Sequence, residues 1–202
     1  MKNKFLLMAV FSVIFSLSLI GISDAYAAIY MKIPDIKGEV TTSGYEGWFV
    51  ADSFSFGVER EMKESGEKGG TTDINIGVGE LQECTISKSM DMSSSKLAQY
   101  AIDGNSLGQA EIHFVEMSSD GKPIPYLKFK LDRAIIKSWS TSGDADDRPT
   151  EEVAFYYNKI AFNYAETKNG RVTGASSTFS WDRTANTSWE DNGFTAVATI
   201  RQ

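Results

Sequence analysis

The most informative part of the chain is the segment Gly143-Asp144-Ala145-Asp146-Asp147-Arg148-Pro149-Thr150-Glu151-Glu152-Val153, with the alternating pattern that follows it. An acidic loop leads into Arg-Pro-Thr-Glu, and apolar residues then recur at every second position: Val153, Phe155 and Tyr157. The alternation resumes one residue out of phase: Ile160, Phe162 and Tyr164. Because side chains of a strand alternate between its faces, such a slip would turn the pattern inside out. We therefore expect a β-bulge near Asn158-Lys159.

Short strand-like segments recur along the rest of the chain at regular spacing. They cover residues 29–33, 48–58, 74–78, 110–117, 126–131, 134–140 and 176–181. Turn signals at 119–122 and 169–170 separate several of them. This spacing predicts a mainly β protein, an antiparallel β-barrel or sandwich with one short helix packed on its side. Residues 60–72 form a charged, glycine-rich loop that is functional or mobile, and residues 194–200 are expected to add an edge strand.

The expected helix starts at one of three serines, Ser93, Ser94 or Ser95, which can cap it. Its apolar stripe has helical spacing and consists of Leu97, Ala98, Ala101 and Ile102. Gly104 stands where a C-terminal cap glycine is expected. The helix is short, so packing on a sheet must hold it in place.

The first 27 residues have the pattern of a secretory signal peptide. Lys2 and Lys4 precede an uncharged run over 5–22, and Ala25-Tyr26-Ala27 fits a cleavage site after Ala27. An uncleaved membrane anchor is the alternative, because the apolar run is near the lower limit for a span. We divide the chain into a signal peptide (1–27), one domain (28–183) and a C-terminal extension (184–202). A secreted or periplasmic location follows, with no membrane contact after cleavage.

The charge balance argues against two classes of partner. Loss of Lys2, Lys4 and Asp24 changes the formal net charge from -7 to -8. An acidic chain without a basic stripe is a poor candidate for binding nucleic acid or an anionic membrane.

The search for catalytic chemistry finds no motif that predicts an enzyme, a cofactor or a metal site. Cys84 and His113 are each the single residue of their type, which excludes an intrachain disulfide and a zinc site of His/Cys type. Asp144, Asp146 and Asp147 resemble a calcium-loop fragment without the EF-hand spacing. We interpret Glu151-Glu152 as solvated charges. Paired carboxylates of a carbohydrate-active enzyme stay an alternative, because their spacing is spatial.

Two residues have an open alternative between an internal and an intersubunit role. Arg148 lies beside a proline, between an acidic loop and two glutamates. It forms either an intrachain salt bridge or a bridge to a neighbouring subunit, where its planar guanidinium suits a carboxylate. Trp48 is either a core residue or an interface anchor.

The sequence resembles the Hcp family (haemolysin-coregulated proteins), the tube proteins of type VI secretion. Residues 147–151 and the phase-slipped strand are the most specific match. The other matching segments are 30–39, 44–48, 53–57, Lys88 with 95–97, 126–131 and 181–182. Together they span residues 29–183.

The resemblance implies a compact β-barrel with a helix on its side, a hexameric ring, and rings stacked into a tube. It implies a contractile sheath, a spike protein and small effectors as partners, and secretion through the type VI system. Residues 60–72 correspond to a loop used in ring stacking. As subunit-interface residues we expect Trp48, Arg60, Lys63, Arg148 and Glu151.

One feature departs from the family pattern. Tube proteins are loaded from the cytoplasm and lack a signal peptide, whereas this chain has the pattern of one. Two functions therefore stay open: a ring and tube component, and an exported Hcp-like binding or adhesive module without tube function.

Overall fold

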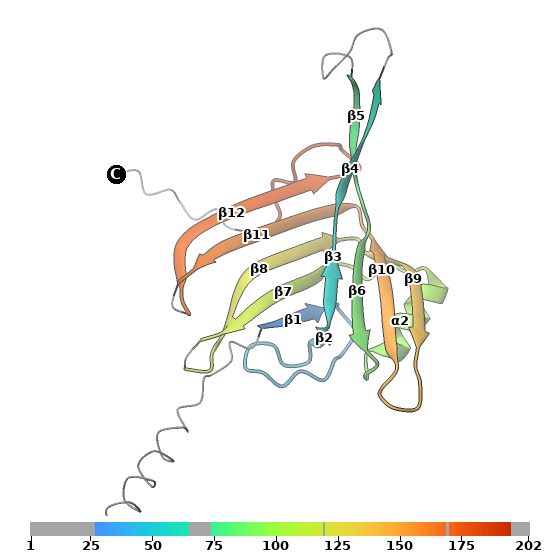
Figure 1. Ribbon diagram of the computed structural model, residues 1–202, viewed down its shortest axis with the longest axis vertical. Helices are drawn as coiled ribbons and strands as arrows, with labels where there is room; N and C mark the ends of the chain where they lie inside the picture. Colours follow the sequence, from blue (N-terminus) through green and yellow to red (C-terminus); the bar gives the residue numbers. More distant parts are fainter. Residues whose placement is uncertain (1–26, 65–73, 119, 169, 195–202) are drawn as a thin grey trace, which may run out of the picture.

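Two antiparallel sheets face each other in a sandwich, and their strands cross at a large angle (Figure 1). The computed structural model describes residues 27–64, 74–118, 120–168 and 170–194. The sheets are not closed into a barrel, so of the two expected architectures the sandwich is the one found. Within the described residues, no helix has the length and apolar character needed to cross a membrane. The expected signal peptide falls on residues 1–26, outside the described part.

The larger sheet has six strands. In spatial order they are β12 (Val172–Asp182), β11 (Lys159–Thr167), β8 (Pro123–Asp132), β7 (Ala110–Met117), β1 (Ala27–Lys32) and β2 (Phe49–Ala51). One row of directly paired apolar residues crosses all six strands: Phe179, Phe162, Phe129, Ile112, Met31 and Phe49. Such cross-strand pairs fix the register, because a slip of one residue would move the whole row to the other face.

The smaller sheet covers this row. Its four strands are β3 (Ser53–Ser55), β6 (Cys84–Ser89), β10 (Thr150–Tyr156) and β9 (Ile135–Ser142). Cys84, Ile86, Val153 and Phe155 point into the shared core and are buried. Burial raises the pKa of the Cys84 thiol, so this side chain packs in the core as a neutral thiol.

The expected bulge at Asn158-Lys159 is wrong, because the phase slip marks a change of sheet. β10 belongs to the smaller sheet and β11 to the larger one, and the chain crosses between them at Tyr157 and Asn158. The Tyr157 hydroxyl donates to the Gln82 carbonyl at 2.7 Å, which holds the corner. Because the two sheets face the core from opposite sides, the corner must reset the phase for both strands to point inward.

Residues 60–64 of the loop expected over 60–72 belong to a strand instead. β4 (Val58–Glu64) pairs with β5 (Ile74–Leu81), and this two-stranded sheet projects beyond the sandwich (Figure 1). Only residues 65–72 of the expected loop lie outside the described part. The segment predicted over 74–78 corresponds to β5, whereas charged and glycine-rich composition hid β4. This hairpin has no core face that would impose an apolar alternation on both of its strands.

Helix α2 (Ser94–Asp103) confirms the predicted segment and corrects its stripe. Gly104 ends it with a φ of 66°, and its N–H donates to the Tyr100 carbonyl at 3.0 Å. Leu97 is buried, whereas Ile102 is 87% exposed. At about 100° per residue, Ile102 lies about 140° from Leu97 around the helix, outside the buried arc.

Part of the C-terminal extension packs back on the larger sheet. The Asp182 N–H donates to the Thr187 carbonyl at 2.8 Å, and Trp189 is buried. The Lys159 ammonium lies 5.7 Å from the Trp189 ring centre, and the Lys130 ammonium lies 4.8 Å from that of Phe194. The domain division at residue 183 stays a prediction. Of the expected edge strand over 194–200, residues 195–200 lie outside the described part.

A buried ion pair joins the smaller sheet to the helix. Lys88 and Glu151 face each other on β6 and β10 and are 1% and 2% exposed. The Lys88 ammonium donates to the Glu151 carboxylate at 2.7 Å, to Asp91 at 2.8 Å and to the Ser89 carbonyl at 2.9 Å. The interpretation of Glu151 as a solvated charge is therefore wrong.

The Glu151 carboxylate accepts two further hydrogen bonds from neighbouring elements. The Ser94 hydroxyl of α2 donates to Oε1 at 2.9 Å, and the Trp139 indole N–H of β9 donates to Oε2 at 2.8 Å. Each charge is thus fully engaged, which is the condition under which a buried pair is tolerated. We call Lys88, Glu151, Asp91, Ser94 and Trp139 the buried clamp.

We predict that breaking the clamp from one side is costly. Lys88→Met leaves a buried carboxylate without its cation, which should lower the free energy of unfolding by about 3–5 kcal/mol. Urea unfolding measures this loss. The double variant Lys88→Met/Glu151→Leu should recover much of it, because no charge stays unpaired. A loss in the double variant equal to the sum of the losses of Lys88→Met and Glu151→Leu alone would show that the two charges are not coupled.

Candidate assembly surfaces

The acidic loop stands free of the sandwich between β9 and β10. Residues 143–150 are all exposed, and short local hydrogen bonds shape the loop, such as that from the Asp146 N–H to the Asp144 carboxylate at 3.0 Å. A Cβ at Gly143 would lie 2.9 Å from Pro149, so the two arms meet only because one of them carries a glycine. The loop therefore presents its carboxylates to the surroundings.

Arg148 lies exposed at the end of this loop. It borders a shallow pocket of about 280 Å³, to which Glu39, Asp52 and Asp91 also contribute. Among the described residues, no carboxylate forms an ion pair with the Arg148 guanidinium. The intrachain salt bridge is thus not formed in the described part of the chain.

The structure does not bring Arg148 and Glu151 together, although only two residues separate them. Glu151 points into the sandwich, where Lys88 neutralises it. A side chain with 2% exposure has no surface to offer a neighbour, so Glu151 supports the loop from inside its own subunit.

Arg60 lies on the projecting hairpin. Its guanidinium donates to the Gly77 carbonyl at 2.6 Å, across the hairpin. Apolar side chains are exposed on the same two strands: Val58, Met62 and Val78. Lys63 pairs with Asn75 through the backbone, and its side chain lies outside what the structure describes.

Trp48 belongs to a small buried cluster on the outer face of β1 and β7, with Tyr30, Val40, Tyr45 and Val115. Its ring centre lies 4.9 Å from that of Tyr45 and 4.8 Å from that of His113. The Tyr45 hydroxyl and His113 Nδ1 are 3.1 Å apart. Burial raises the pKa of Tyr45 to about 12. Within one subunit, Trp48 is therefore a core residue. Its role as an interface anchor stays a prediction.

The β4–β5 hairpin and the acidic loop lie at opposite ends of the smaller sheet. The hairpin projects from one end, and the acidic loop with Arg148 closes the other (Figure 1). The sequence alone does not show Asp91, Ser94 and Trp139 as partners of the Lys88–Glu151 pair, because the packing of β9 and the start of α2 against β6 and β10 brings them together. In the described part of the chain, no group of three His, Cys, Asp or Glu residues is placed to hold a metal ion.

Comparison with known proteins gives the family. The family model described as "Type VI secretion system effector, Hcp" matches residues 30–164, which is more than half of the chain. No curated protein matches the chain in sequence.

Solved structures share the fold at low identity. A structure described as a type six secretion system protein is 23% identical with a TM-score of 0.70, covering 81% of this chain and 100% of its own. Hcp1 from Salmonella typhimurium is 20% identical with a TM-score of 0.62, covering 82% and 100%. Secreted protein Hcp3 from Pseudomonas aeruginosa is 20% identical with a TM-score of 0.53, covering 77% and 99%. The match of the family model, on a sandwich that these structures share, shows that the chain belongs to the Hcp family of type VI secretion proteins.

Proposed function

We propose that this chain is a ring and tube component of a type VI secretion system, forming hexameric rings that stack into an inner tube. The observation that carries the proposal is the family match over residues 30–164. Proteins of this family self-assemble into rings and tubes. The described residues supply what such assembly needs, which is a rigid sandwich with unlike exposed ends.

Closure of a ring requires two different and complementary faces on each subunit. The chain has a formal net charge of -7, so copies repel one another at long range. Contacts between them must therefore match local patches of opposite sign or bury apolar surface. Arg148, an exposed cation beside an acidic loop, suits the first kind of contact.

The β4–β5 hairpin suits the second kind. Met62 is 63% exposed and Val78 is 70% exposed, so the hairpin offers apolar surface for a partner to cover. A shallow pocket of about 500 Å³ lies at the base of the hairpin, between Val58, Phe179 and Trp181. We assign the hairpin to contacts between stacked rings, as the family resemblance implies.

The same resemblance supplies the other proposed partners. A spike protein at the tip, a contractile sheath around the tube and small effectors in its lumen would each bind the assembled form. Affinity purification of a tagged chain from secreting cells tests these partners. If none of the three is recovered with the tagged chain, they are removed from the proposal.

Charge reversal at Arg148 tests ring formation. Light scattering and negative-stain electron microscopy of residues 28–202 should show rings with six times the mass of one chain. Arg148→Glu should raise the dissociation constant of the ring about tenfold, since an attractive ion pair becomes repulsive. Circular dichroism should stay unchanged.

Two controls accompany this variant. Arg148→Lys keeps the positive charge and should retain most of the assembly, and Lys96→Glu, an exposed helix residue, should leave it unaffected. A wild-type protein that stays monomeric at high concentration would rule out the ring.

Acidic substitutions on the hairpin test stacking separately from ring closure. Met62→Asp/Val78→Asp should leave the mass of single rings unchanged and abolish longer stacks, because two charges replace apolar contacts. Electron microscopy at high protein concentration counts stacks against single rings. Stacks as long as those of the wild type would exclude the hairpin from the contact.

We propose further that residues 1–27 are an export signal removed after Ala27. β1 begins at Ala27, and Ala28 pairs with Val115, so cleavage there would cost the sheet a single residue of that strand. Mass spectrometry of the protein recovered from a periplasmic fraction should find Ala28 at the N-terminus. An intact Met1 in all fractions would contradict cleavage.

A further inference from the structure

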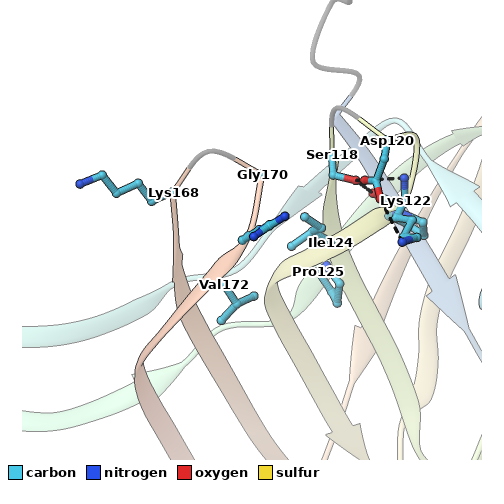
Figure 2. A pocket seen from close by; sticks show the side chains of 10 residues that line it. Ser118, Asp120, Lys122, Ile124, Pro125, Lys168, Gly170 and Val172 are labelled. Atoms are coloured by element: carbon cyan, nitrogen blue, oxygen red, sulfur yellow. Dashed lines mark hydrogen bonds and ion pairs between the residues drawn. The ribbon is translucent and has the colours of Figure 1, made fainter.

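A cleft opens between two hairpin turns at one end of the larger sheet. It has a volume of about 890 Å³ and lies between the β7–β8 turn and the β11–β12 turn (Figure 2). We call it the hairpin cleft. Its volume falls within the range of roughly 300–1,000 Å³ that binding pockets typically have.

The hairpin cleft exists because β8 and β11 separate before they end. Their pairing runs from Asp132 opposite Lys159 to Leu127 opposite Tyr164, and no pair is formed beyond that point in the described residues. Pro123 and Pro125 lie in the separated part of β8. Proline has no N–H to donate, so this part of the strand is a poor partner for a ladder.

The walls of the hairpin cleft are apolar and its rim is cationic. Ile124, Pro125 and Val172 lie between the two turns in Figure 2, which also shows Lys122 joined to Asp120. Their ion pair measures 2.9 Å. Hydrogen bonds from Ser118 and then Lys122 lower the pKa of Asp120 to about 2, so this pair stays charged at neutral pH and neutralises itself.

Two cations of the β11–β12 turn have no such partner among the described residues, and Figure 2 shows the Lys168 side chain extending outward from the turn. Lys168 and Arg171 form no ion pair within the part of the chain that the structure describes. They face solvent on a chain whose formal net charge is -7. Unpaired cations beside apolar walls favour an occupant with carboxylates on a short, exposed backbone.

The chain carries such a segment elsewhere on its surface. Asp144, Asp146 and Asp147 are exposed in the acidic loop, and no cation among the described residues pairs with them. In Figure 1 the acidic loop lies below β9 and β10, whereas the two turns of the hairpin cleft lie at the far end of the larger sheet. One subunit cannot bring these surfaces together, but a second copy can.

We propose that the hairpin cleft of one subunit receives the acidic loop, residues 143–147, of the next subunit in the ring. This inference rests on the proposed ring function and names the contact that closes it. The contact is head-to-tail, because the two surfaces are different and lie on different sides of the subunit. Their opposite charges also steer the copies into this orientation and disfavour contacts between like surfaces.

Charge reversal on each side tests the contact. Lys168→Glu/Arg171→Glu reverses the hairpin cleft, and Asp144→Lys/Asp146→Lys reverses the acidic loop. Each double variant alone should raise the dissociation constant of the ring by about tenfold or more at low salt, since attraction becomes repulsion at every interface. Light scattering over a dilution series measures this shift, and the effect should shrink at high salt.

Mixing the two double variants gives the sharper test. In an equimolar mixture, a ring with alternating variants matches every cleft to a loop of opposite charge, so rings should reappear. The control Lys37→Glu/Lys96→Glu changes the net charge as Lys168→Glu/Arg171→Glu does, but on other exposed surfaces. It should assemble like the wild type.

The outcomes separate this inference from the proposed function. Wild-type rings together with unimpaired assembly of each double variant would overturn the cleft contact and leave the ring function standing. Failure of the mixture to assemble while the Lys37→Glu/Lys96→Glu control forms rings would also overturn it. A wild-type chain that forms no ring would contradict both the proposed ring function and the cleft contact.

Discussion

The buried pair of Lys88 and Glu151 is the interaction on which the surrounding structure depends. It lies where β6, β9, β10 and the start of α2 meet, and every strong donor or acceptor of either side chain has a partner. A buried ion pair adds little net stability, yet removing one partner is costly. The pair therefore acts as a constraint on geometry: β10 must begin at one position, and the loop that precedes it is held in one place at the surface.

This internal constraint separates the two roles that one short segment combines. Glu151 belongs to the interior, while Arg148 and the carboxylates before it belong to the surface. At the other end of the same sheet, the β4–β5 hairpin exposes apolar side chains that offer surface to a partner. An assembling protein needs this combination, because a rigid body must hold unlike surfaces in fixed relative positions for a ring to close and for rings to stack.

Alternation and turn residues predicted the mainly β class, most of the strands and the helix with its Gly104 cap. They failed where the cause was not local. The slip after Tyr157 is a change of sheet, which looks the same in sequence as a bulge. β4 lacks a core face and therefore lacks the apolar pattern, whereas β5 kept enough alternation over residues 74–78 to be predicted. Glu151 and Lys88 are separated by 63 positions, and only strand register brings them together. The cations of the hairpin cleft come from two turns whose proximity depends on the order of strands.

Electron cryomicroscopy of the assembled protein tests the central claim most directly, because it shows in one map which groups are internal and which meet a neighbour. We expect a closed ring of identical head-to-tail contacts, with Lys88 paired to Glu151 inside every subunit and with Arg148 and the acidic loop against the next subunit. Two-fold symmetric dimers, or a Glu151 carboxylate paired across the subunit boundary, would contradict it.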